Sequence, residues 1–459
     1  MKWAILVLAL AAAAPLGLLL RGRRQALWVV AAMAGLLPFV GLDHLDINVL
    51  SFETYRGDAR GLEITVVDLL AIAAFVALPT RESAPYRVAR LLYLGAVLLS
   101  FKDAPNPLFS FFSVWKLVRM YVFFAAMVRV ATRPHLAAGL LSGMGAGVVY
   151  NLLVALSDRY LHGMMRPMGA FSHPNSLGMA ANLVLPIALA IVLAAPRAPL
   201  AIAAAVAAPL CVVLTLSRGA LMLTVVEIVV VLGVSMLRKP TRRKTIVAIA
   251  IAVAGLAVVV KSADTLVERF TQAPPQSEQS RVLFNQAARA MLSDHPFGVG
   301  INQFSYVLAN RGYAEALEIP EIDQDGITHH IYWLTAAETG WLGVTTYVVM
   351  LALPLIAALR LVRAKGLRGD LALGIWVALA TMYLHGTAEW IARQTAMSYM
   401  FWAVAAVGVG LQRTAWKAVP NRLMTRPERL VSTHLAAEPL RHAPCSSPDM
   451  VASVERNGE

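Results

Sequence analysis

The chain consists largely of apolar runs separated by short polar or proline-containing breaks. Most runs have about 17 to 25 residues, the length that an α-helix needs to cross a bilayer. They show no alternation of apolar and polar positions, which excludes a transmembrane β-barrel. We therefore predict an all-α membrane protein with about 12–13 transmembrane helices. The predicted spans lie near residues 3–20, 25–41, 62–80, 88–101, 113–131, 136–156, 174–195, 199–217, 218–237, 245–261, 330–359, 371–388 and 395–411.

Composition agrees with a membrane protein, and the charge pattern indicates its orientation. Apolar residues make up 58% of the 459 residues and charged residues 15%, against roughly 45–50% and about 25% in a soluble domain. Alternate breaks are rich in Arg and Lys, whereas the opposite ones are mostly acidic. The basic side is predicted to be cytoplasmic by the positive-inside rule. The net charge of +13 thus reflects orientation, and no nucleic acid partner is expected. The basic breaks are residues 21–24, 81–90, 128–134, 238–244 and 360–368.

The break at residues 262–328 is much longer than the others, and the alternation of spans places it on the external side of the membrane. It contains the helical pattern SRVLFNQAARAMLSDHP, so we predict a small external subdomain. Cys211 lies in an apolar run and Cys445 in the polar tail, which makes a disulfide between them implausible. The predicted division is N-terminal transmembrane helices (1–261), a periplasmic loop subdomain (262–328), C-terminal transmembrane helices (329–411) and a disordered cytoplasmic tail (412–459).

Polar and ionisable residues at span ends are the candidates for function, because a charge inside the bilayer is costly. On the predicted external side they gather in four blocks, RPMGAFSHPNS, TLSRGA, SRVLFNQAARAM and THHIYWLTAAETG. The alternative for each residue is a structural role, as an interfacial anchor, a solvated helix face or a helix start. The candidates are Arg166, His173, Asn175, Arg218, Arg281, His329, His330, Tyr332 and Glu338.

Two of these residue types, arginine and histidine, suit chemistry on a phosphate. Arg218 joins two apolar runs with almost no linker, and Arg281 opens the pattern in the long loop. A guanidinium presents a planar fork that matches phosphate oxygens. His329 precedes an aromatic span entry, and a neutral imidazole is a suitable base at neutral pH. Glu338 lies inside the following span, where a buried acid needs a partner.

The sequence offers no metal or nucleotide motif. His329 and His330 are adjacent and point to different helix faces, and neither an H-E-x-x-H motif nor a cysteine cluster accompanies them. A P-loop and a G-x-G-x-x-G motif are also absent. We therefore predict no metal, no cofactor and a substrate that is already activated.

Four blocks in this order resemble the O-antigen ligase and polymerase superfamily, bacterial glycosyltransferases of the C type. They are GAFSHPNSLGMAANL, TLSRGALM, SRVLFNQAARAMLSDHPFGVGINQF and HHIYWLTAAETGWLG, within about residues 166–345. The family's last block has Asn after its His, then Glu and Gly nine and eleven residues after that His. Glu338 and Gly340 fit this spacing if His329 is the family's histidine, which leaves His330 where Asn is usual. An alignment shifted by one residue is the alternative.

The resemblance implies a multi-pass protein of the bacterial inner membrane with its active site facing the periplasm. It implies transfer of a glycan from undecaprenyl pyrophosphate to an acceptor hydroxyl, with inversion and without nucleotide sugar or metal. We favour an O-antigen ligase that uses the lipid A core as acceptor. A polymerase that extends a growing polysaccharide is the alternative, and some relatives glycosylate proteins. A polysaccharide or lipid transporter would show inverted repeats and midplane charges, and we find neither pattern.

The resemblance also implies roles for the candidates. Arg218 and Arg281 would stabilise the pyrophosphate, and His329 would take the acceptor's proton. The remaining candidates would contact the glycan or the lipid head.

The orientation can be tested at position 276. A Gln276→Cys variant should react with a membrane-impermeant thiol reagent in intact cells, because alternation places the long loop outside. Protection of this cysteine would overturn the orientation.

Overall fold

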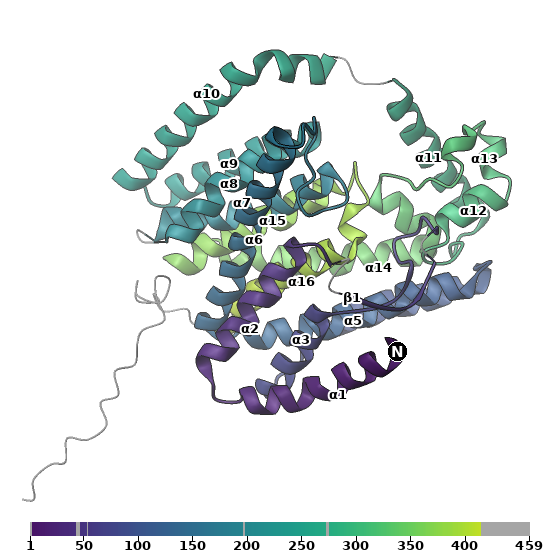
Figure 1. The fold of residues 1–459 in the computed structure, drawn as a ribbon, viewed down its shortest axis with the longest axis horizontal. Coiled ribbons are helices and arrows are strands. Elements are labelled where there is room, and N and C mark those ends of the chain that lie inside the picture. Colours follow the sequence, from purple (N-terminus) through teal and green to yellow (C-terminus); the bar gives the residue numbers. More distant parts are fainter. Residues whose placement is uncertain (1, 43–45, 53, 196–197, 272–274, 415–459) are drawn as a thin grey trace, which may run out of the picture.

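The computed structural model describes residues 2–42, 46–52, 54–195, 198–271 and 275–414. It is mainly α-helical (Figure 1), which confirms the predicted fold class. Each predicted span overlaps a helix, while most of the predicted tail lies outside the described residues. These helices are α1 (Lys2–Leu20), α2 (Arg24–Leu36), α3 (Val66–Ala77), α4 (Arg87–Leu99), α5 (Pro107–Ala131), α6 (Pro134–Tyr160), α7 (Pro174–Ala194), α8 (Pro199–Thr215), α9 (Arg218–Arg238), α10 (Arg242–Thr271), α14 (Ile331–Leu361), α15 (Leu367–His385) and α16 (Thr395–Arg413).

Not all of these helices are equally suited to cross a bilayer. Within the described part of the chain, 7 are long and apolar enough, namely α5, α6, α7, α9, α14, α15 and α16. Shorter apolar helices lie within α1, α2, α3 and α8, and α4 and α10 occupy the other two predicted runs. The protein is therefore a polytopic membrane protein, and the full count of crossings stays a prediction.

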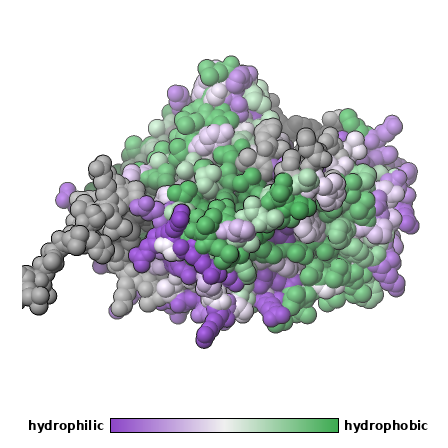
Figure 2. Space-filling model, turned by 60° about the horizontal axis from the view of Figure 1, so that its bottom comes forward, coloured by the Kyte–Doolittle hydropathy of each residue, from purple (hydrophilic) through white to green (hydrophobic). Residues whose placement is uncertain are grey.

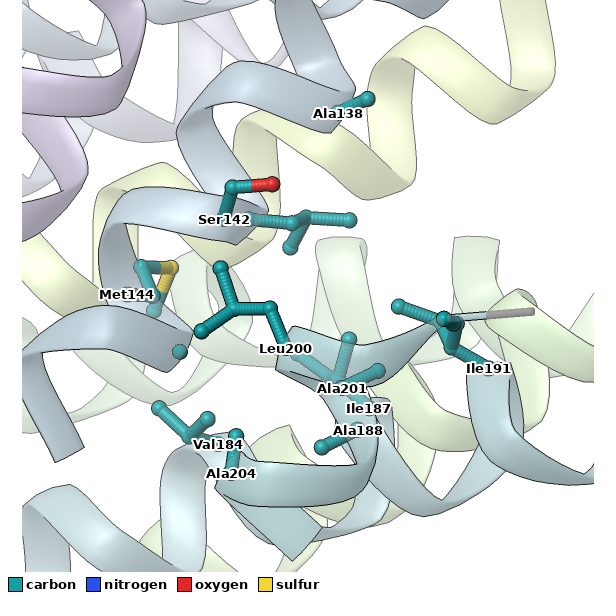
Figure 3. A pocket seen from close by; sticks show the side chains of 13 residues that line it. Ala138, Ser142, Met144, Val184, Ile187, Ala188, Ile191, Leu200, Ala201 and Ala204 are labelled. Atoms are coloured by element: carbon teal, nitrogen blue, oxygen red, sulfur yellow. The ribbon is translucent and has the colours of Figure 1, made fainter. Parts of the chain in front are cut away.

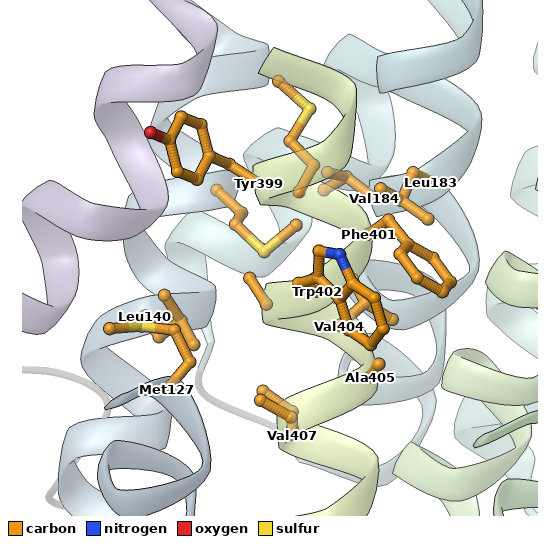
Figure 4. Close-up of a cluster of buried hydrophobic side chains, with 14 of the residues drawn as sticks. Met127, Leu140, Leu183, Val184, Tyr399, Phe401, Trp402, Val404, Ala405 and Val407 are labelled. Atoms are coloured by element: carbon orange, nitrogen blue, oxygen red, sulfur yellow. The ribbon is translucent and has the colours of Figure 1, made fainter. Parts of the chain in front are cut away.

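Helices α7 and α16 form the centre of the bundle. Their apolar windows are 94% and 78% buried, whereas those of α9 and α14 are 28% buried. Figure 4 shows Tyr399 and Trp402 of α16 beside Met127 of α5, Leu140 of α6 and Leu183 of α7. Hydrophobic residues also cover much of the face that Figure 2 shows. This distribution suits a bundle surrounded by lipid.

The basic breaks meet at one end of the bundle. Arg413 pairs with Glu82 at 3.1 Å, and Arg238 pairs with Asp370 at 2.8 Å. Arg368 Nε donates to the carbonyl of Leu411 at 2.8 Å. These contacts confirm that the basic breaks share an end, and their cytoplasmic side stays a prediction.

The expected helix over residues 62–80 begins later than predicted. Strands β1 (Asp46–Ser51) and β2 (Gly61–Thr65) pair antiparallel, with Ile47 opposite Ile64. Helix α3 begins only at Val66, where Thr65 and Asp68 form a reciprocal capping box. The prediction of an entirely helical span here was wrong, because a strand from the preceding loop pairs with its first residues.

The long loop contains the helix that its pattern predicts. Residues 281–294 belong to α11 (Pro275–Asp294), followed by α12 (Phe304–Asn310) and α13 (Tyr313–Ala316), which lie together at one end of Figure 1. Their apolar core includes Phe284, Met291 and Leu308, and also Leu334 of α14. The loop therefore shares its core with the transmembrane part.

Short 3-10 turns are η1 (Leu37–Phe39), η3 (Ser100–Asp103), η4 (Glu321–Asp323) and η5 (Ile391–Arg393).

The loop docks onto a break in α14. Gly340 leaves helical geometry, with φ 69° and ψ −173°. The N–H groups of Val299 and Gly300 donate to the carbonyls of Ala337 and Glu338, both at 3.0 Å. At Gly298, which has a φ of 89°, a Cβ would lie 2.3 Å from the carbonyl oxygen of Glu338. Only glycine allows this approach at this backbone angle.

A Gly298→Ala substitution should destabilise the protein by about 2 to 4 kcal/mol, because it combines backbone strain with a clash. Gly312→Ala is the matched control, since its φ is 78° but nothing lies within 4 Å of the added Cβ. Thermal unfolding of both variants in detergent would compare the two effects. Equal losses of stability in the two variants would show that the contact between the loop and α14 does not contribute to the stability of the protein.

Candidate functional site

A buried glutamate between α15 and α16 joins three segments of the chain. Glu389 is 4% exposed. Its Oε1 accepts hydrogen bonds from Asn175 Nδ2 at 2.6 Å and from Arg281 Nη2 at 2.9 Å, and its Oε2 lies 2.9 Å from His329 Nδ1. Three predicted site residues from α7, α11 and the start of α14 therefore meet at one carboxylate. We call these four residues the Glu389 cluster.

The start of α7 brings a second arginine to the cluster. His173 caps this helix, because its Nδ1 accepts from the N–H of Asn175 at 3.1 Å, and Pro174 suits the first helical position. Arg166 Nη2 donates to Asn175 Oδ1 at 3.3 Å, and its Nε donates to the carbonyl of Thr215 at 3.1 Å. Arg166, His173 and Asn175 thus lie together, as their shared block in the sequence suggested.

Arg218 is the first residue of α9 and is half-buried. Leu216, at the end of α8, takes a left-handed conformation with φ 51°, which turns the chain directly into α9. A Cβ on Gly219 would lie 3.9 Å from His385 Nε2. His385 precedes Glu389 by one helical turn, and its carbonyl accepts from the N–H of Glu389 at 3.0 Å. The start of α9 therefore lies beside the segment that carries Glu389.

The charges around Glu389 determine its ionisation. Burial raises the pKa of this carboxyl, but the hydrogen bond and charge of His329 and the charge of Arg281 outweigh burial, so the net shift is downward. Glu389 is therefore an anion at neutral pH. Burial is also the main reason that the pKa of His173 is lowered, and the charge of Arg166 adds to it. His173 is a neutral imidazole at neutral pH.

Three arginines gather in this region. Arg281 belongs to the Glu389 cluster, Arg166 is joined to it by a hydrogen bond to Asn175, and Arg218 lies at the neighbouring helix start. Guanidinium groups match phosphate oxygens, so the region suits an anionic ligand.

Glu389 also sets the tautomer of His329. An ionised carboxylate 2.9 Å from Nδ1 favours a proton on that nitrogen. The other ring nitrogen, Nε2, then carries a lone pair that can accept a proton. The side chain of His329 is 34% exposed, so this nitrogen is accessible to a ligand. The assignment follows from the hydrogen bond.

His330 and Tyr332 make different contacts. His330 Nδ1 accepts from the N–H of Trp333 at 3.3 Å and so caps α14. Burial lowers the pKa of His330, and the charge of Arg289 adds to this shift. Tyr332 donates its hydroxyl to the carbonyl of Tyr383 at 3.0 Å. These contacts favour structural roles, and the substrate roles expected for both residues stay predictions.

Glu338 lies in a separate network of charges. Its Oε2 pairs with Arg393 Nη1 at 2.7 Å, and its Oε1 accepts from the N–H of Phe304 at 3.1 Å. Arg393 also pairs with Asp58 at 3.0 Å. The carboxylate of Glu338 thus fastens the long loop and the turn before α16 to α14. This arrangement favours a structural role over the predicted substrate contact.

Three residues near the end of α15 were not predicted from the sequence. They are His385, at the end of the predicted span 371–388, and Glu389 and Arg393, in the break that follows this span. A signal was present, since this break lies on the predicted external side and contains ionisable residues. Its residues match no block of the resemblance, and nothing in the sequence pairs Glu389 with residues more than 50 positions away.

Two cavities within the bundle differ in character. One of about 80 Å³ lies under Arg393 and is lined by Lys116, Tyr93, Tyr332 and Tyr347. Figure 3 shows another pocket, between α6, α7 and α8, in which Ser142 is the one polar side chain among those that line it. The second pocket offers nothing to bind an anion.

A Glu389→Gln substitution should lower the thermal midpoint of the purified protein, because it leaves Arg281 without its counter-charge and removes the ionised partner of His329; we expect a loss of about 1 to 3 kcal/mol at neutral pH. The pKa of Glu389 is depressed, so its contribution is complete above the pKa of an unfolded carboxyl and is lost as pH falls through the folded value. The difference from the wild type should therefore shrink in acid. An exposed Glu321→Gln control should change little, and a Glu389→Gln effect no larger than this control would contradict the pairing.

Sequence comparisons support the resemblance. Residues 202–348 match the family model described as O-Antigen ligase. The matched region contains Arg218, Arg281 and His329, whereas Asn175 and Glu389 lie outside it. A search of curated proteins finds no match. This match over about a third of the chain supports the resemblance to the O-antigen ligase and polymerase superfamily, and with it a role in glycosyl transfer of the ligase or polymerase type.

Proposed function

We propose that the protein transfers a glycan from undecaprenyl pyrophosphate to a hydroxyl of the lipid A core, at the periplasmic face of the inner membrane. The observation that carries this proposal is the Glu389 cluster, in which one buried carboxylate holds Arg281 and a half-exposed His329. The family match supports glycosyl transfer of the ligase or polymerase type. The donor, the acceptor and the side of the membrane are parts of the proposal.

The arginines would stabilise the leaving group. Transfer breaks the bond between the anomeric carbon and the pyrophosphate, and negative charge grows on the departing oxygen. Fixed cations in a water-poor site stabilise such charge by about 3 kcal/mol each. Arg281 is held by Glu389 but 38% exposed, so part of its guanidinium is free to reach a ligand. Arg218 and Arg166 would complete the phosphate site.

His329 would take the proton of the acceptor. As the acceptor oxygen attacks the anomeric carbon, its proton passes to His329 Nε2, and Glu389 stabilises the imidazolium that forms. The C–O bond to pyrophosphate breaks on the opposite face of the sugar, so this single displacement inverts the anomeric centre. The lipid pyrophosphate leaves with the electrons of the broken bond.

The proposed reaction uses no metal, because the arginines balance the charge of the pyrophosphate. No group of three or more His, Cys, Asp or Glu side chains is arranged to hold a metal ion in the described residues. A chelator should leave transfer unchanged in membranes supplied with the lipid-linked donor, and loss of activity would refute this part of the proposal.

A glycan profile of a deletion strain tests the function. Loss of all long chains from the lipid A core supports a ligase. Cores capped with a single repeat unit would indicate a polymerase, which would use the same donor. Normal envelope glycans would refute both.

Arg218→Ala and Arg281→Ala should each reduce transfer by about a hundredfold or more, because each removes a cation from the leaving group. Lysine at either position should restore part of the rate, since it keeps the charge but loses the fork. Arg311→Ala is the control, an exposed arginine of the same loop. The wild-type rate in an alanine variant would remove that arginine from the site.

Substitutions of His329 and His330 test which histidine is the base, and so whether the family's last block is aligned correctly. His329→Ala should reduce the transfer rate by about two to four powers of ten, the span of general base catalysis. His330→Asn should be mild, because Asn can also cap a helix. Rates would be compared at equal amounts of protein in the membrane. A dead His330→Asn beside an active His329→Ala would assign the base to the other histidine.

A further inference from the structure

A basic pocket opens at the end of the bundle opposite the Glu389 cluster. It has a volume of about 410 Å³ and lies between α4, α5 and the segment that joins α3 to α4. Thr80, Ser83 and Thr132 contribute polar groups to its wall. Arg413, which ends α16, closes one side. The pocket is thus at the end where the basic breaks meet.

The charge of this pocket is strongly positive. Arg87, Arg90, Arg129 and Arg413 line it, against a single acid, Glu82. Glu82 pairs with Arg413. In the part of the chain that the structure describes, no acidic side chain forms an ion pair with the other three arginines. Three cations therefore line one cavity without an acidic partner among the described residues.

Arg90 is the strongest indication of a ligand. It is 8% exposed, and its Nε has no hydrogen-bond partner among the described residues. The guanidinium lies 5.1 Å from the ring centre of Tyr121 and 5.2 Å from that of Phe124, which holds it in place. A buried donor without a partner is costly, so an anion that accepts from Arg90 would remove this cost.

The surroundings favour a lipid over a soluble anion. Leu91 lines the pocket and is 51% exposed, and Val88 on the same helix is 71% exposed. Val118 and Val122 of α5 are also exposed apolar side chains. A phosphate in the pocket would therefore have apolar helix faces beside it, along which acyl chains can lie. Basic pockets between transmembrane helices suit anionic lipid head groups.

We propose that this pocket binds the phosphate of an anionic phospholipid, with its acyl chains along the exposed faces of α4 and α5. Arg90 donates to the phosphate from the wall, and Arg87 and Arg413 contact it from the rim. The site is separate from the Glu389 cluster and does not depend on the proposed glycosyl transfer.

Native mass spectrometry of the full-length protein in detergent tests the proposal, with dioleoylphosphatidylglycerol as the ligand and dioleoylphosphatidylcholine as the comparison. The anionic lipid should bind more tightly. Arg90→Gln should weaken its binding roughly fivefold, and the double change Arg87→Gln with Arg413→Gln by more, in line with the attraction of single basic residues to anionic lipid. Arg360→Gln is the control, an exposed arginine at the same end that does not line the pocket.

A second substitution tests the charge in the other direction. Glu82→Gln removes the one acid of the lining and releases Arg413, so it should tighten binding of phosphatidylglycerol. If Arg90→Gln does not fold, the rim pair and Glu82→Gln still decide the question. Equal binding of both lipids, or rim and Glu82 variants indistinguishable from the Arg360 control, would overturn the proposal. Full displacement of the lipid by an equal concentration of inorganic phosphate would also overturn it, since it would assign the site to a soluble anion.

Discussion

The docking of residues 296–304 onto the break in α14 is the constraint on which the site depends. A helix that breaks inside a membrane protein leaves carbonyls without partners, and each must be satisfied by other protein groups. Here the N–H groups of Val299 and Gly300 satisfy two of them, and Glu338 adds a bond to the N–H of Phe304. This docking fixes the end of α11 against α14. Because α11 carries Arg281 and α14 begins just after His329, both can reach Glu389.

The two networks of buried charge differ in how far their members are exposed to solvent. Glu338 and Asp58 share Arg393 in a network that is almost fully closed to solvent, where side-chain exposures are 9% or less. Because the charged groups of this network are buried and paired with one another, the network holds the elements together and offers no group to a ligand. The Glu389 cluster is different, because its carboxylate is 5% exposed while Arg281 and His329 are 38% and 34% exposed. Its anion is buried, while the side chains of Arg281 and His329 are partly exposed, which suits a role in binding and proton transfer.

The sequence predicted the parts of the fold that depend on local pattern. Helix positions followed from apolar length, and the helix in the long loop followed from its periodicity. The β1–β2 hairpin was missed, because its strands are joined by a loop and lie at the edge of an apolar run that also reads as helix. Arg166, His173 and Asn175 were found together because they share one short block. Glu389 was not found, since its partners come from three distant segments and only the folded chain joins them.

Whether His329 acts through Glu389 is the central claim, and a double-mutant cycle on transfer tests it most directly. Rates would be measured in membranes for His329→Ala, Glu389→Gln and the double variant, each at equal protein. If His329 acts through Glu389, the loss in the double variant should be clearly smaller than the product of the two single losses, because part of the Glu389→Gln loss comes from the orientation of His329. Losses that multiply would contradict the account, because they would confine the role of Glu389 to its contacts with Arg281 and Asn175.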